Sequence, residues 1–286
     1  MESCLGKILE RVITNRYTDV VLARIILPDT QFSAPGRSCP QALEYLLAIV
    51  YRGWCPGQRQ AGNSRYVSMM TLDMTGAFNR VPHAKLLEVL ESMGIPAWLV
   101  NITRSFLSCR STKLAMPGYL SGLYFVNIGV PQGSPLSPIL FALFTAGLLK
   151  RLETTTVLRS VDPCAEKFVF AYADDNHIMI ISKSFKLNCL AFQALHPVIM
   201  EWAEEHGASF GPSKYHVMHF LPPGMSFSCP SDHRFSLNVL RDAELSHQGG
   251  QKLASKHRRT PQGCRQGCRS RAGCDDSLPF ALVPSC

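Results

Sequence analysis

The chain has 286 residues, of which 46% are hydrophobic and 17% are charged, a composition that is typical of a folded globular protein and excludes a disordered one. The formal net charge is +8, but most of the basic excess lies after residue 244, so charge alone does not establish a nucleic-acid partner. No apolar run approaches the ~20 residues of a membrane helix, and the first residues do not resemble a secretory leader. An intracellular protein that does not contact a membrane is therefore expected, with its cysteines as free thiols.

Apolar periodicity predicts helices and strands in an irregular order along the chain. The first helix, within 5–27, is expected to bury one apolar face: Leu5, Ile8, Leu9, Val12 and Ile13. Further helices are predicted at 41–51, 83–93, 97–108, 138–152 and 189–206, and strands at 66–73, 112–116, 123–130, 168–172, 177–181 and 215–220. This irregular alternation favours an α+β fold over a doubly wound sheet.

Three acidic residues follow or join predicted strands. Asp73 ends the apolar run VSMMTLD, and Asp174 and Asp175 lie in the short turn between the strands at 168–172 and 177–181. Adjacent acids between two strands most often only form the turn, because Asp tolerates its geometry. Acids at neighbouring strand ends can instead share two Mg²⁺ ions about 4 Å apart, which stabilise the attacking and leaving oxygens of a phosphoryl transfer.

Four segments in succession resemble the palm motifs of reverse transcriptases. They are LDMTGAFNRV (72–81), GVPQGSPLSPILF (129–141), FAYADD (170–175) and GASFGPSKYHVMHF (207–220). The order and spacing are those of the family, and the Ser-Pro after the Gln-Gly pair resembles the non-LTR, LINE-like retrotransposon type, with a fungal character elsewhere in the chain. The resemblance implies a right-hand polymerase palm with partial fingers and no thumb.

The resemblance also implies the roles of the acidic and basic residues. Asp73, Asp174 and Asp175 match the metal carboxylates for two Mg²⁺ ions, with Mn²⁺ as an alternative, and Asp175 is the more supportive of the three. Lys214 matches a lysine that protonates the departing pyrophosphate, although a lone lysine is more commonly a solvated surface residue. Arg37 is expected either to contact template or triphosphate or to lie on the surface.

Other matched positions concern substrate selection. Phe78 matches a ring under the incoming sugar that excludes a 2′-hydroxyl; without the motif it would be read as a core residue. Gln132 and Gly133 match the loop beside the incoming nucleotide and template base, and Tyr172 opens the Tyr-Ala-Asp-Asp turn and is counted with the substrate-binding residues. The implied partners are an RNA template, a DNA primer and deoxynucleoside triphosphates.

The resemblance implies three regions. Residues 1–65 are expected to form partial fingers, 66–222 the palm together with connecting helices at 82–110, and 223–286 a degenerate or disordered basic tail. The family resemblance places such an enzyme in the nucleus, with the mitochondrion as an alternative. Two other functions stay open: an inactive remnant that at most binds nucleic acid, and an intron-encoded maturase. Because the resemblance implies partial fingers and no thumb, the chain is not expected to extend a primer at a useful rate.

Two departures from the family pattern concern single positions. Ala34 stands where an arginine usually precedes the Pro-Gly-Arg-Ser segment, and Gly211 stands where a polar residue is expected.

Overall fold

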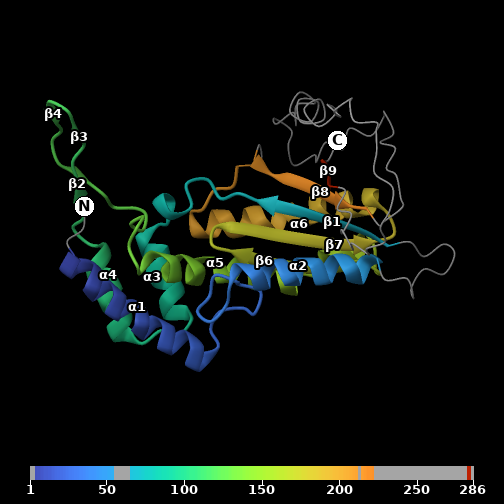
Figure 1. The fold of residues 1–286 in the computed structure, drawn as a ribbon, viewed down its shortest axis with the longest axis horizontal. Helices are drawn as coiled ribbons and strands as arrows, with labels where there is room; N and C mark the ends of the chain where they lie inside the picture. The colour runs from blue at the N-terminus through green and yellow to red at the C-terminus, as the bar shows by residue number, and fades with distance from the viewer. Residues whose placement is uncertain (1–3, 55–64, 212–213, 222–281, 285–286) are drawn as a thin grey trace, which may run out of the picture.

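The computed structural model describes residues 4–54, 65–211, 214–221 and 282–284. They form a mixed helix and sheet structure (Figure 1), which confirms the expected α+β class. The helices are α1 (Cys4–Arg24), α2 (Cys39–Trp54), α3 (His83–Ser92), α4 (Ala97–Leu107), α5 (Ser137–Thr154) and α6 (Phe185–His206), with 3-10 turns η2 (Phe78–Arg80) and η3 (Val157–Ser160). Among the described residues, no helix is both long and apolar enough to cross a membrane.

A five-stranded antiparallel sheet runs through the centre of the molecule. Its order is β6 (Glu166–Tyr172), β7 (Asp175–Ser182), β1 (Tyr66–Leu72), β8 (His216–Phe220) and β9 (Leu282–Pro284). The central strand β1 therefore pairs with β7 on one side and with β8 on the other. These two pairings bring together strands that lie more than 100 residues apart in the sequence.

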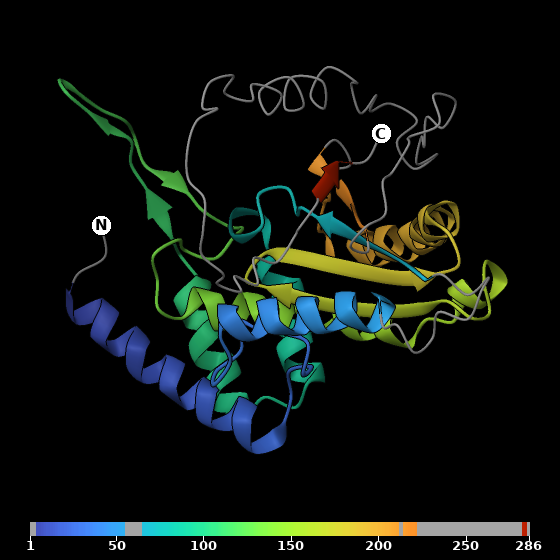
Figure 2. The same ribbon diagram turned by 45° about the vertical axis from the view of Figure 1, so that its right-hand side comes forward.

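Side chains on opposite faces of the sheet enter two different cores, because alternate residues of a strand point to opposite sides. On β1, Met70 and Leu72 belong to the larger core with α5 and α6, whereas Val67 and Met69 belong to a second core with α2. The helix α2 runs alongside the sheet (Figure 2). The near-continuous apolar strands of the sequence thus reflect a sheet that is covered by helices on both sides.

The predicted buried face of the first helix is wrong. Of its five residues only Ile13 is buried; the side chains of Leu5, Ile8, Leu9 and Val12 are at least half exposed. The helix instead buries Glu10, Ile13, Tyr17 and Val21. Hydrogen bonds account for this choice: the Tyr17 hydroxyl lies 2.6 Å from Thr103 Oγ1 on α4, and Glu10 accepts a hydrogen bond from Ser134 Oγ. Apolar periodicity alone does not detect such polar anchors.

A narrow hairpin replaces the two longer strands that were predicted at 112–116 and 123–130. It consists of two short ladders, β2 (Ser111–Thr112) with β5 (Tyr124–Phe125) and β3 (Ala115–Met116) with β4 (Tyr119–Leu120). Figures 1 and 2 show it projecting away from the body. The strand predicted to continue to residue 130 ends at Phe125, because the following residues bond to the segment before α3 instead.

The predicted tail, 223–286, lies outside the described residues except for 282–284. Those three residues form β9 and pair with β8, where Val283 is opposite His219. The expectation of a degenerate or disordered tail did not include this strand, and the only sequence signal for it is a short apolar run near the end of the chain.

Candidate active site

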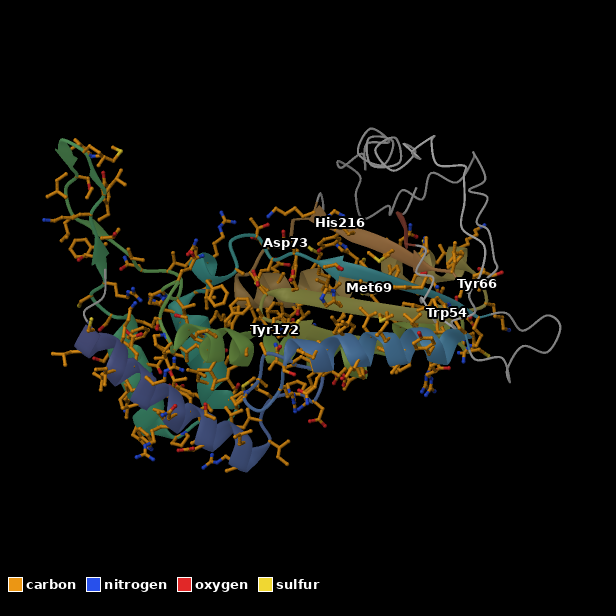
Figure 3. The ribbon with its side chains drawn as sticks, viewed as in Figure 1. Trp54, Tyr66, Met69, Asp73, Tyr172 and His216 are labelled. Carbon is orange, nitrogen blue, oxygen red and sulfur yellow. The ribbon has the colours of Figure 1, made fainter. Side chains whose placement is uncertain are left out.

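The carboxylates meet at one end of the sheet because β1 and β7 are antiparallel neighbours. Leu72, the last residue of β1, is opposite Asn176, so the next residue along the chain, Asp73, comes beside Asp175, the first residue of β7. Tyr172 is opposite Asp175 on the other side, and Ala173 and Asp174 form the two-residue turn between them. Figure 3 shows Asp73 and Tyr172 at this end of the sheet.

The turn that carries Asp174 has an unusual backbone. Ala173 has a φ of 55°, in the left-handed region that a residue with a side chain seldom occupies. Two-residue hairpin turns require such a conformation and normally place Gly there. Asn176, which is almost fully buried, donates a hydrogen bond of 3.0 Å from Nδ2 to the Asp174 carbonyl. In the sequence, only the place of Asn176 directly after the acidic pair indicates this role, and it was not among the predicted site residues.

The three acids interact electrostatically. Burial raises the pKa of Asp175, and the negative charges of Asp174 and then Asp73 raise it further. A raised carboxyl pKa means that holding these charges together costs free energy, which a nearby cation offsets. One such cation belongs to the chain itself: Lys214 Nζ lies 3.0 Å from Asp73 Oδ2.

The acids do not form a ready three-ligand metal site. Within the described part of the chain, no group of three His, Cys, Asp or Glu side chains is close enough together to hold an ion. The donor set nevertheless fits a hard divalent cation in its chemistry, because carboxylate oxygens are the ligands that Mg²⁺ prefers. Asp73, Asp174 and Asp175 are the residues that would hold it.

Backbone hydrogen bonds of Gly211 connect Asp73 to Lys214. The Gly211 amide donates to the Asp73 carbonyl at 3.2 Å, and its carbonyl accepts from the Lys214 amide at 2.8 Å. A Cβ at position 211 would lie 3.1 Å from Thr75 Oγ1 and 3.5 Å from Lys214 Cδ. A side chain at position 211 would therefore crowd the Thr75 hydroxyl, whereas the Lys214 stem would stay at an ordinary contact distance.

Phe78 lies half-buried in η2, where its ring stacks on Phe141 of α5 with centroids 4.6 Å apart. Its carbonyl accepts a hydrogen bond of 2.7 Å from the Val130 amide. Nearby, a Cβ at Gly129 would fall 2.6 Å from the Asn79 carbonyl oxygen, so only glycine permits this contact. The two motifs around Phe78 and Gln132 are thus joined directly.

The loop that carries Gln132 and Gly133 is exposed but well anchored. Ser137 Oγ donates to the Pro131 carbonyl at 2.6 Å, and Ser134 Oγ donates to Glu10 Oε2 at 2.5 Å. Glu10 and Ser134 are both buried. Sequence reasoning missed this pair, since nothing in the sequence links a glutamate of the first helix to a serine 124 residues later.

Arg37 has a structural contact in place of a free surface position. Its guanidinium donates to Asp29 Oδ1 at 2.7 Å, to the Gln31 carbonyl at 3.1 Å and to the Pro28 carbonyl. The loop that it closes lies against the hairpin of β6 and β7, because the Phe32 amide donates to the Ala171 carbonyl at 2.8 Å. Arg37 therefore helps to hold this loop beside β6, and its contact with template or triphosphate stays a prediction.

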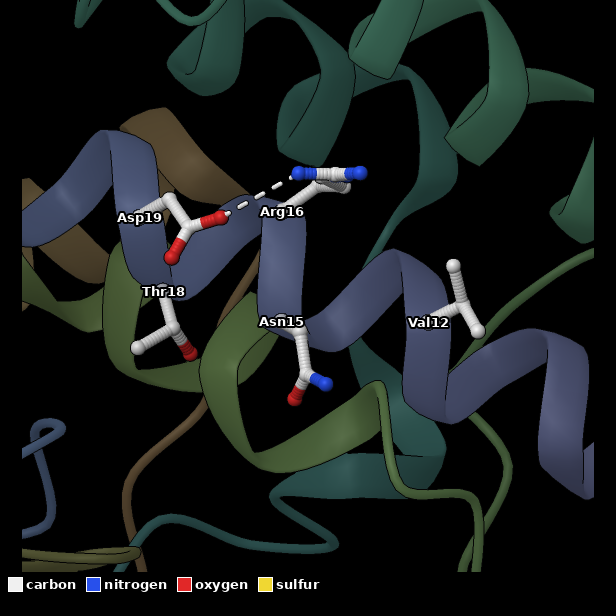
Figure 4. Close-up of a pocket in the computed structure, with 5 residues that line it drawn as sticks. All are labelled: Val12, Asn15, Arg16, Thr18 and Asp19. Atoms are coloured by element: carbon white, nitrogen blue, oxygen red, sulfur yellow. Dashed lines mark ion pairs between the residues drawn. The ribbon is translucent and has the colours of Figure 1, made fainter.

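A pocket on α1 lies apart from these residues. It is lined by Val12, Asn15, Arg16, Thr18 and Asp19, and Arg16 pairs with Asp19 at 3.6 Å (Figure 4). All five residues come from one helix, and none is among the predicted site residues. It resembles a surface hollow more than the enclosed, mostly apolar sites that bind small ligands.

Comparison with known proteins supports the resemblance. A family model described as "Reverse transcriptase (RNA-dependent DNA polymerase)" matches residues 1–260. The chain is 28% identical over 227 residues to the RNA-directed DNA polymerase from the mobile element jockey of Drosophila melanogaster, covering 79% of this chain and 23% of that protein. It is 29% identical over 108 residues to a Pol polyprotein from the type-1 retrotransposable element R2 of Popillia japonica, covering 38% and 18%. These elements are of the expected non-LTR type, and the fungal character stays a prediction.

Solved structures show the same fold at low sequence identity. A telomerase from Candida tropicalis, solved with a fragment of telomeric RNA, superposes with a TM-score of 0.53 at 11% identity, covering 76% of this chain and 35% of that one. An apo form that lacks its C-terminal domain gives a TM-score of 0.52 at 12% identity, covering 78% and 42%. This confirms the right-hand polymerase fold. The chain spans about a quarter of the length of the curated relatives that it matches over most of its residues.

Proposed function

Because the chain belongs to the reverse transcriptase (RNA-dependent DNA polymerase) family, we propose that it carries the nucleotidyl-transfer site of an RNA-directed DNA polymerase. The observation that carries the proposal is the register of β1 and β7, which places Asp73 beside Asp175 at the turn that contains Asp174. Residues 66–222 form the palm in this proposal. The substrates are an RNA template, a DNA primer and deoxynucleoside triphosphates.

The reaction joins the primer 3′-oxygen to the α-phosphorus of the triphosphate and breaks the bond to pyrophosphate. Two Mg²⁺ ions, when bound, neutralise charge on the attacking and leaving oxygens. Asp73 and Asp174 would hold them most directly, with Asp175 in support. The protein contributes chiefly by holding the reacting groups in line and by placing charge where it develops.

Lys214 has the position and chemistry to give a proton to the departing pyrophosphate. Its ammonium is half exposed and lies 3.0 Å from Asp73 Oδ2, so it sits beside the acids without being buried. The same contact neutralises Asp73, and a divalent cation has to compete with it for that oxygen. Lys214 is thus proposed to donate a proton to pyrophosphate and to compete with the divalent cation for the Asp73 carboxylate.

The substrate-facing residues are proposed from their place around the acids. Phe78, held against Phe141, would lie under the sugar and exclude a 2′-hydroxyl. Gln132 and Gly133 present an exposed loop to the nucleotide and template base. Gly133 has a φ of 86°, which favours glycine, and the absence of a side chain there leaves its backbone open to a ligand. Tyr172 is exposed at the end of β6 and would contact the primer side of the site.

Two measurements test the proposal on the full chain. Binding of Mn²⁺, followed by electron paramagnetic resonance, reports on the acids; incorporation of a single nucleotide into an RNA-templated DNA primer reports on chemistry. We expect weak Mn²⁺ binding and slow, non-processive incorporation, both lost in Asp73→Asn and Asp174→Asn. Asp19→Asn removes an exposed acid from α1 and is the matched control that should change neither.

The alternative is an inactive remnant that at most binds nucleic acid. Mn²⁺ binding without any incorporation at high protein concentration would support the remnant. Incorporation that persists in Asp174→Asn would contradict the proposed site itself.

A further inference from the structure

The projecting hairpin exposes several apolar and aromatic side chains. We define the hairpin arm as residues 110–126; all eight residues of its four short strands are exposed. The side chains of Tyr119, Tyr124 and Phe125 are 55%, 58% and 71% exposed. An isolated two-stranded hairpin is only marginally stable in water, and contiguous exposed apolar surface commonly marks a contact site.

The charge of the arm is of one sign. The sequence has no Asp or Glu between Glu91 and Glu153, whereas the arm contains Arg110 and Lys113. The Arg110 guanidinium lies over the Phe106 ring, 5.4 Å from its centroid, which holds a cation at the base of the arm. Aromatic rings together with basic groups, and no acids, are the combination that binds single-stranded nucleic acid, because bases stack on the rings and phosphates contact the cations.

The arm is joined directly to the residues around the proposed nucleotide site. The Val126 amide donates to the Arg110 carbonyl at 2.8 Å and closes the base of the arm. Beyond it, the Gly129 amide donates to the Val81 carbonyl at 2.8 Å and the Val130 amide to the Phe78 carbonyl at 2.7 Å. Figures 1 and 3 show the arm beyond the end of the sheet at which Asp73 lies.

We propose that the hairpin arm is a contact site for a single nucleic-acid strand next to the polymerase site. The three aromatic rings provide stacking surfaces for unpaired bases, and Arg110 and Lys113 contact the phosphates. That this strand is the template rests on the proposed function; that the arm binds a single strand does not. The stretch 110–130 thereby links strand binding to the loop that carries Gln132.

The test is the affinity of the full chain for fluorescent single-stranded RNA and DNA oligonucleotides of about 12 nucleotides, within the length range that one binding module covers, measured by anisotropy. The combined variant Tyr119→Ala, Tyr124→Ala, Phe125→Ala should raise the dissociation constant at least about tenfold, since each stacked base contributes substantially. Lys113→Gln should lower the slope of log affinity against log salt by about 0.7. The RNA and DNA oligonucleotides show which strand the arm prefers.

A matched control is Leu190→Ala with Met200→Ala, two partly exposed apolar residues of α6, which should leave affinity unchanged.

Equal affinity of the aromatic variant and the wild type, at equal helical content, would overturn the proposal. So would absence of oligonucleotide binding by the wild type, or dissociation of an oligomer on substitution without a change in affinity, which would make the arm a protein interface. Asp174→Asn should retain strand binding while it loses incorporation, so failure of either proposal is distinguishable.

Discussion

The central sheet and the hairpin arm are both antiparallel, yet they use apolar residues in opposite ways. In the sheet, Met70 and Met69 are neighbours in sequence and enter two different cores, so apolar residues on both faces of β1 are buried. In the arm, Tyr124 and Phe125 alternate in the same manner and both remain exposed. The buried residues of the sheet are therefore expected to contribute most to the free energy of unfolding, and the exposed residues of the arm little.

Truncation of a sheet residue should have the largest effect. Ile180 of β7 is fully buried in the core with α5 and α6. Ile180→Ala removes methyl groups and leaves a cavity, so we expect the free energy of unfolding to fall by about 2–5 kcal/mol. Urea denaturation followed by circular dichroism measures it. A loss below about 1 kcal/mol would mean that the sheet core is loosely packed.

Acid should destabilise the sheet next. Burial lowers the pKa of His219 to about 4 from an ordinary 6.5, and its Nδ1 lies 2.7 Å from Ser68 Oγ. The unfolded chain binds a proton at this histidine below pH 6.5, whereas the folded chain binds one only near pH 4. The free energy of unfolding is therefore highest above pH 6.5 and falls by about 3 kcal/mol as the pH is lowered to about 4. Burial also lowers the pKa of His177 to about 4, which adds loss of the same sign.

Denaturation curves at pH 7, 6, 5 and 4.5 measure this dependence, and His219→Gln should make it shallower. An identical slope in the variant would assign the acid sensitivity to other groups.

Removal of the hydroxyl of Ser134 should have an intermediate effect. Ser134→Ala leaves the buried Glu10 carboxylate without this hydrogen bond, which costs about 1–3 kcal/mol. Ser160→Ala is the control, since Ser160 is exposed and bonds only within its own turn. Thermal melting compares the two variants. Equal melting temperatures would show that the Gln132 loop is held by other contacts.

Phe78 is less buried than the sheet residues and less exposed than the arm residues, and its ring stacks on Phe141. Phe78→Val should cost about 1 kcal/mol of stability, because part of the ring is already exposed. It should also increase incorporation of ribonucleotides relative to deoxynucleotides, measured in the single-nucleotide assay. Unchanged discrimination, together with a larger loss of stability, would identify Phe78 as a packing residue alone.

The smallest effect is expected in the arm. Phe125 is 71% exposed, and Phe125→Ala should change the free energy of unfolding by no more than about 0.5 kcal/mol. Circular dichroism melting measures it alongside Ile180→Ala. A loss comparable to that of the sheet variant would mean that the arm packs against the body in solution.

The sequence was sufficient for the elements whose signals are local. The helix predicted at 97–108 is found at 97–107, and the strand predicted at 66–73 ends at Leu72, directly before Asp73. Pro and Gly residues, and apolar runs bounded by turns, define such boundaries without tertiary information. The fold class followed from their order.

Other features of the fold and of the site depend on contacts between distant residues, which the sequence does not indicate. The buried face of α1 is fixed by hydrogen bonds of Tyr17 and Glu10 to distant partners, and Arg37 is engaged by carbonyl groups of its own loop. The motifs identified Asp73, Asp174, Asp175 and Lys214, but only the structure pairs Lys214 with Asp73. The assignment of residues 1–65 and 66–222 to fingers and palm stays a prediction.

The central position of β1 has a thermodynamic consequence for the site. Asp73 follows β1, Asp175 opens β7 and Lys214 precedes β8, so the geometry among them is set by the hydrogen bonds of three adjacent strands. Such strands typically open only in global unfolding, whereas loops and termini open in smaller local steps. Amide exchange of Met69 and Ile180 should therefore be slow and share one opening free energy, and the cation affinity of the acids should vanish at the same denaturant concentration as that protection.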